Sequence, residues 1–130
     1  MKSYTDIEQS KVLSKILPIE SADMAYIKHS SSDNPTWEFN EDVPPMILGN
    51  VLINELTVEG LPCWSLDALL NILPDTITSN DGIAFKLNIK KNIIEYSNPS
   101  LYLIYKASIA DNLIDACYEM IVKFKENNLL

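Results

Sequence analysis

Hydrophobic residues recur with helical spacing in three stretches of the chain, which predicts three amphipathic helices. The expected helices cover Asp6–Leu17, Ser65–Leu73 and a C-terminal stretch that ends at Asn127. The middle helix has the clearest limits, because Ser65 is a typical N-cap residue and Pro74 disfavours helical geometry in the residue before it. Its four leucines, at positions 66, 69, 70 and 73, share one face. We therefore expect this short helix to be central to the hydrophobic core.

The starts of the other two helices rest on capping residues. Thr5 and Glu8 have the spacing of a capping box, which places the first helix start at Asp6. The C-terminal helix starts near residue 109 or residue 112, with Ser108 or Asp111 as its N-cap. Its broad apolar face includes Cys117, which predicts that this helix lies across a sheet.

Strict alternation of apolar and polar residues over Ile83–Lys90 predicts a strand with one buried face. If Lys91 and Asn92 form a two-residue turn, Ile89 lies opposite Ile94 and Leu87 lies opposite Tyr96. Both apolar pairs then share one face of a hairpin, and this consistency supports the register.

The next stretch, Leu101–Ala107, is apolar on both of its faces, which is typical of an interior strand. Further strands are expected at Asp23–Lys28, Thr36–Phe39 and Val51–Val58. The pattern predicts an α+β fold in which about three helices pack mainly on one face of an antiparallel meander of four to five strands. A chain of this length predicts a single domain over residues 1–130.

Acidic residues are concentrated in the middle of the chain. The formal net charge is −8, and His29–Phe85 contains nine acidic residues and no lysine. The sequence also contains no arginine, the residue best suited to bidentate phosphate or guanine contacts. We therefore expect neither direct nucleic-acid binding nor association with an anionic membrane, and interpret the acidic middle as a solvated surface.

No stretch has the length and apolar character of a membrane span, and no apolar segment follows the N-terminal residues, so we expect a cytoplasmic protein. Cys63 and Cys117 match no metal-ligand or redox spacing, which predicts reduced core thiols. Glu38, Glu41 and Asp42 lack the spacing and glycine of a calcium loop, so a solvated loop is expected there. We expect no metal site and no cofactor.

Three segments together resemble small uncharacterised proteins encoded by gut anaerobic bacteria, often within prophages or other mobile elements. The segments are Tyr4–Met24, Pro62–Pro74 and Asp115–Glu126, and they cover less than half of the chain. Since all three are amphipathic-helix signatures, the resemblance implies a shared fold and a bacterial or phage origin. It implies no activity, and no catalytic residue is carried over from it.

Two sets of residues are candidates for function. Cys63 precedes a helix N-terminus, where amides and the helix dipole lower a thiol pKa, and His29 is the only histidine available as a base. The alternative is a buried thiol and a surface histidine. Trp37 and Phe39 form an aromatic pair in an acidic, proline-flanked segment, which is a candidate surface for a protein partner. The alternative is that both rings cover the core or the sheet edge.

These observations favour a non-enzymatic accessory or protein-interaction protein of bacterial or phage origin. The leading hypothesis rests on the missing catalytic motifs, the missing arginine and the acidic middle of the chain. The alternative hypothesis is a small enzyme or ligand-binding domain that uses Cys63 and His29. The identity of a partner or ligand and the oligomeric state have no signature in the sequence.

Overall fold

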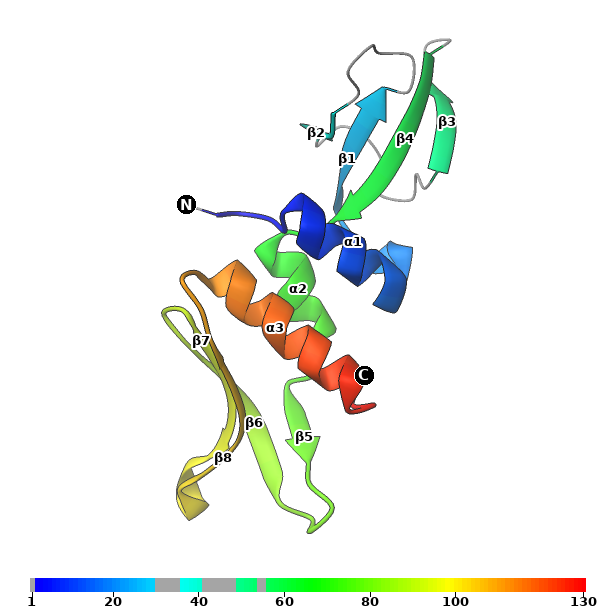
Figure 1. Ribbon diagram of the computed structural model, residues 1–130. Coiled ribbons are helices and arrows are strands. Elements are labelled where there is room, and N and C mark those ends of the chain that lie inside the picture. The colour runs from blue at the N-terminus through cyan, green and yellow to red at the C-terminus, as the bar shows by residue number, and fades with distance from the viewer. Residues whose placement is uncertain (1, 30–35, 41–48, 54–55) are drawn as a thin grey trace. The chain divides into compact units, whose positions relative to one another are not determined.

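A computed structural model describes residues 2–29, 36–40, 49–53 and 56–130 of the chain. Its α-helices are α1 (Ile7–Ile16), α2 (Leu66–Ile72) and α3 (Leu113–Glu126), and its 3-10 turns are η1 (Ile19–Ser21) and η2 (Pro99–Leu101). The strands are β1 (Met24–His29), β2 (Glu38–Asn40), β3 (Gly49–Ile53), β4 (Leu56–Cys63), β5 (Thr76–Thr78), β6 (Ala84–Lys90), β7 (Ile93–Asn98) and β8 (Leu103–Ile109) (Figure 1). These elements confirm the predicted α+β class.

The chain divides into two compact units, and the boundary falls within α2. The first unit, Ser3–Ala68, contains an antiparallel sheet with the strand order β2-β1-β4-β3, and α1 packs against β4. The second unit, Leu69–Leu130 together with residues 1–2, contains an antiparallel sheet with the order β5-β6-β7-β8. The prediction of one domain over residues 1–130 stays a prediction.

The second sheet is the predicted meander, because its four strands are neighbours in chain order. Ile89 lies opposite Ile94 and Leu87 lies opposite Tyr96, which confirms the hairpin register derived from the alternation. Helix α3 packs against β7 and β8. The ring of Tyr96 meets the ring of Phe124 from α3 at a centroid distance of 5.1 Å, and both side chains are fully buried. One face of the meander therefore forms the core of this unit.

The helix limits agree with the predicted ranges to within a few residues, but two of the expected caps are wrong. The N-cap of α1 is Asp6, whose side chain accepts from the Gln9 backbone at 2.8 Å while Gln9 Oε1 accepts from the Asp6 N–H at 3.1 Å. The N-cap of α3 is Asn112, whose side chain accepts from the Asp115 N–H at 2.9 Å, while Ser108 lies within strand β8. Ser65 caps α2 as predicted, since its Oγ accepts from the Ala68 N–H at 3.2 Å.

Thr5 is free of the capping role because it lies at the centre of a buried hydrogen-bond network. Its N–H donates to the Trp64 carbonyl at 2.9 Å, and its hydroxyl accepts from the Trp64 N–H at 3.1 Å. The same hydroxyl lies 2.8 Å from Ser10 Oγ, and the Tyr26 hydroxyl donates to the Thr5 carbonyl at 2.7 Å. The network joins the N-terminal segment to α1, β1 and the residue after β4. It therefore fixes these elements of the first unit relative to one another.

Replacing Thr5 by valine keeps the shape of the side chain but removes the hydroxyl, so the Trp64 N–H loses its buried acceptor. We expect Thr5→Val to lower the free energy of unfolding by about 1–3 kcal/mol in urea denaturation. The matched control is Thr76→Val on the exposed strand β5, where the expected change is within about 0.5 kcal/mol. Equal effects of the two substitutions would contradict a special role for Thr5.

Candidate functional site

The two residues of the predicted catalytic pair lie at opposite ends of one strand pair. In the register of β1 with β4, Met24 lies opposite Cys63 and His29 lies opposite Val58. Five positions along a strand correspond to about 17 Å. The structure describes the backbone of His29 but not its side chain. The fold therefore does not bring the backbones of Cys63 and His29 together, and nothing in the described contacts favours the alternative function.

Both thiols lie in the protein interior. Cys63 has no exposed surface, and its Sγ lies 3.4 Å from the Thr5 carbonyl and 3.6 Å from the Thr5 hydroxyl. Burial raises the pKa of the Cys63 thiol above its usual value, and burial raises the pKa of the equally buried Cys117 to about 12. A thiol that is both buried and protonated is a poor nucleophile.

The aromatic pair predicted as a partner surface packs against residues of its own unit. Phe39 stacks on Tyr4 with a ring centroid distance of 4.1 Å and an interplanar angle of 5°. Trp37 receives the Lys28 ammonium over its ring at 4.7 Å. Both rings are half-buried and pack against the cluster that contains Tyr26. These contacts fit the alternative interpretation, in which the rings cover the core.

Strand β8 differs most from its predicted role. Its residues are apolar on both faces, yet it is an edge strand, because β7 is its only neighbour in the described sheet. The prediction of an interior strand is therefore wrong. Large apolar side chains that an interior strand would bury remain exposed on β8 and on the turn before it.

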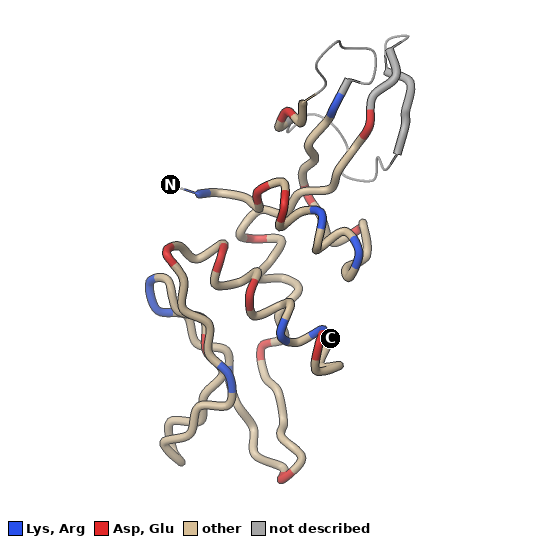
Figure 2. The backbone as a smooth tube through the Cα atoms, viewed as in Figure 1, with Lys and Arg blue, Asp and Glu red and all other residues tan. Residues whose placement is uncertain are grey.

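We define the β8 patch as the exposed large apolar residues of this strand and the preceding turn. Their exposed fractions range from 41% to 94%, and they are Leu101, Tyr102, Leu103, Ile104, Tyr105 and Ile109. Together these side chains expose on the order of several hundred Å² of apolar surface, an amount that often marks an interaction site. Figure 2 shows the end of the β7–β8 hairpin without any charged residue. Between Tyr96 and Ala110, the only charged residue is Lys106.

Helix α3 contacts the free edge of β8 through Lys123. Lys123 Nζ donates to the Ala107 carbonyl at 3.0 Å and to Ser108 Oγ at 3.1 Å. The Ala110 N–H donates to the Asn92 carbonyl, and hydrogen-bonded pairs alternate along an antiparallel ladder. Ser108 therefore directs its backbone groups toward β7, whereas Ala107 directs its groups toward the free edge. A lysine at this position occupies a backbone carbonyl of the free edge, so this part of the edge is less able to pair with another strand.

Tyr102 is the most exposed member of the β8 patch and has an unusual backbone. It adopts the left-handed conformation, with φ 54° and ψ 38°, at the end of η2. That conformation costs about 1–2 kcal/mol for a residue with a side chain. The turn is fixed by Asn98, whose side chain accepts from the Leu101 N–H at 3.2 Å and donates to the Ala84 carbonyl at 3.0 Å. A rigid turn thus presents a tyrosine ring to solvent at a measurable cost in stability.

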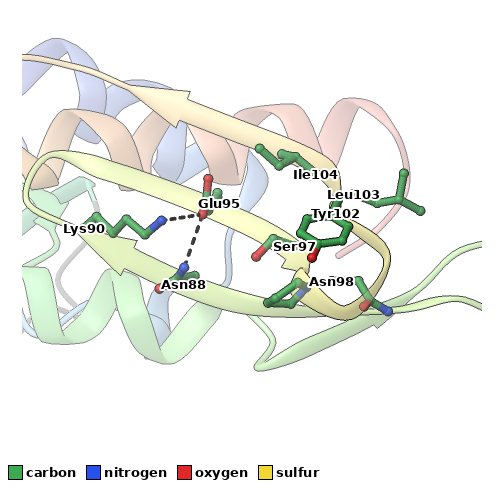
Figure 3. A pocket seen from close by; sticks show the side chains of 9 residues that line it. Asn88, Lys90, Glu95, Ser97, Asn98, Tyr102, Leu103 and Ile104 are labelled. Atoms are coloured by element: carbon green, nitrogen blue, oxygen red, sulfur yellow. Dashed lines mark hydrogen bonds and ion pairs between the residues drawn. The ribbon is translucent and has the colours of Figure 1, made fainter.

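Beside this ring, the outer face of the sheet carries a shallow groove of about 270 Å³. Figure 3 shows Tyr102, Leu103 and Ile104 at one end of the groove and a polar group at the other end. In the polar group, Glu95 Oε1 accepts from Asn88 Nδ2 at 3.2 Å and lies 3.4 Å from Lys90 Nζ. Since the carboxylate is already paired, this arrangement is suited to binding an amphipathic side chain and offers no activated base or nucleophile.

A second hollow of about 400 Å³ lies across Ser97, Asn98 and Pro99, which line both hollows. The remaining residues that line it are Ala84, Lys86 and Ser100. The outer face near the hairpin end therefore has a hollow on each side of strand β7, and side chains of a partner can dock into these hollows.

Sequence reasoning missed the β8 patch because it treated two-sided apolar character as evidence of burial. The order of elements contained the missing signal. The last strand of a meander lies at the edge, and only three residues separate β8 from α3. An apolar last strand in such an arrangement predicts an exposed apolar edge.

Comparison of the chain with protein-family models, curated proteins and solved structures found no match. Among the described residues, no group of three His, Cys, Asp or Glu residues is placed to hold a metal ion. Glu41 and Asp42 of the predicted solvated loop lie outside the described residues. No helix that the structure describes has the length and apolar character needed to cross a membrane.

The burial of both thiols predicts slow labelling by Ellman's reagent at neutral pH. We expect native Cys63, isolated in the Cys117→Ala variant, to react at least about 100-fold more slowly than in guanidinium, since it reacts only through local or global opening. Both cysteines of the wild-type chain should react rapidly once the chain is denatured. Complete labelling of native Cys63 within seconds would show that its thiol is accessible. Cys63 would then again be a candidate nucleophile for an enzyme.

Proposed function

We propose that this chain is a non-enzymatic protein-interaction protein that binds its partner through the β8 patch. The observation that supports the proposal most strongly is the exposure of a two-sided apolar strand at a sheet edge. An interaction surface is the ordinary reason for a chain to keep such a strand exposed, because an exposed apolar edge otherwise promotes aggregation.

The geometry around the patch supports binding by a partner protein. Tyr102 is 94% exposed on a turn held by Asn98, so the backbone that carries the ring needs no ordering on binding. The groove beside it combines an apolar end with a polar end. Exposed aromatic residues next to a shallow groove are typical of the centre of a protein interface.

The proposal extends to an accessory protein of bacterial or phage origin. The helical segments that resemble small proteins of gut anaerobes support this origin. The pairing of Glu95 with Lys90 and the burial of Cys63 support a binding role over a catalytic one.

Photo-cross-linking tests the location of the binding surface directly. We expect a chain with p-benzoylphenylalanine in place of Tyr102 to form a discrete adduct when the purified protein is irradiated in a bacterial lysate. The matched control carries the same group in place of Val12, an exposed apolar residue of α1 outside the patch. Adducts of equal yield from both positions, or none from position 102, would contradict the proposed surface.

The left-handed backbone of Tyr102 predicts that stability and binding respond in opposite directions. Asparagine adopts this conformation more readily than tyrosine. We therefore expect Tyr102→Asn to raise the free energy of unfolding in urea by up to about 1 kcal/mol while it weakens partner binding. A variant that binds as well as the wild type would show that the ring is not part of the interface.

A further inference from the structure

We propose that the partner of the β8 patch is a second copy of this chain, which pairs its own β8 antiparallel to the first. This inference rests on the proposed function and specifies the partner. The two sheets would then join edge to edge around a two-fold axis, and the N-terminal end of each β8 would gain a neighbouring strand.

The distribution of charge favours a second copy. The unit Ser3–Ala68 contains eleven acidic residues and three lysines, whereas the unit that holds β8 contains seven of each. Two copies of a strongly acidic chain repel each other unless they meet through a part without net charge. The meander belongs to the neutral unit, and the end of its β7–β8 hairpin carries no charged residue (Figure 2).

The two-fold axis is placed by charges and backbone groups along β8. An axis at Lys106 would bring two ammonium groups opposite each other, a destabilising cross-strand pair. At Ala107 the carbonyl already accepts from Lys123. Both observations move the axis toward the N-terminal half of the strand, where Ile104 is 63% exposed.

The hydrogen-bond pattern makes Ile104 suitable for this position. The backbone groups directed toward β8 are those of Asn92, Ile94 and Tyr96. The register of the two strands shifts by one residue between Tyr96 and Ser97, and Asn98 continues the alternation beyond this shift. Asn98 lies opposite Leu103, so the N–H and C=O groups of Ile104 are directed toward the free edge. At a two-fold axis through Ile104, each copy donates its N–H to the carbonyl of the other. The paired segment is Leu103–Tyr105 of each copy, because β8 begins at Leu103.

Disulfide cross-linking tests this register. In a hydrogen-bonded antiparallel pair, the two Cα atoms at the axis lie about 5.5 Å apart, within the range of a disulfide. We expect Ile104→Cys to form a covalent dimer under mild air oxidation, since both native thiols are buried. In the same dimer two copies of residue 109 lie about 33 Å apart, so the matched control Ile109→Cys should stay monomeric. A dimer from Ile109→Cys and none from Ile104→Cys would overturn the register.

Sedimentation equilibrium tests the association itself. We expect the wild type to sediment with twice its chain mass of 14.7 kDa, and Ile104→Lys to raise the dimer dissociation constant by at least about 30-fold. The control Val12→Lys should leave the constant unchanged. A monomeric wild type overturns self-association. In that case, a photo-cross-link from position 102 to a different protein would still support the proposed binding function of the β8 patch. A monomer without any cross-linked partner contradicts both.

Discussion

The constraint that shapes this protein is that an edge strand with apolar residues on both faces cannot be buried by the described elements of its own sheet. Strand β8 has β7 on one side and no described strand on the other, while α3 covers only one face of the meander. The side chains on the outer face and at the free edge therefore meet water. Completion of the sheet by another strand would remove this cost, and the proposed interaction role rests on that need.

The rest of the C-terminal unit is organised so that this strand is held rigidly. The rings of Tyr96 and Phe124 pack at a tilt of 45° within the core, and the hydroxyl of Tyr96 donates to the Pro74 carbonyl at 2.5 Å. Lys123 extends from the same helix to the edge of β8 and caps one carbonyl there. The half of the edge near Ala107 is thus protected from pairing by Lys123, whereas the half around Ile104 remains available for pairing. This division argues for a defined pairing register rather than unselective aggregation.

Much of the fold was predictable, because local patterns and tertiary packing agree in the hairpin and in α2. The pairing of Ile89 with Ile94 follows from alternation alone. The cap of α1 was not predictable in the same way, because Thr5 and Asp6 are both good N-caps and the choice depends on the distant Trp64, which recruits the Thr5 hydroxyl. Of the expected N-caps of α3, Ser108 was wrong because β8 continues through it to Ile109, and Asp111 lies one residue before the actual cap, Asn112.

The candidate site was predictable only in part. The burial of Cys117 follows from its place on an apolar helix face, and the structure shows that thiol fully buried. The role of β8 was not predictable from its composition, because an interior strand and a partner-covered edge strand require the same side chains. No feature of the sequence indicates the left-handed backbone of Tyr102, since tyrosine is not a residue that favours this conformation.

Amide hydrogen exchange at Ile104, followed by NMR at low and high protein concentration, reports whether a second strand completes this sheet edge. We predict that this amide exchanges rapidly in dilute solution and becomes protected as concentration rises. The Ser108 amide should stay protected at both concentrations, because β7 pairs with it. An Ile104 amide that exchanges equally fast at every concentration would contradict the claim that a second strand completes this edge.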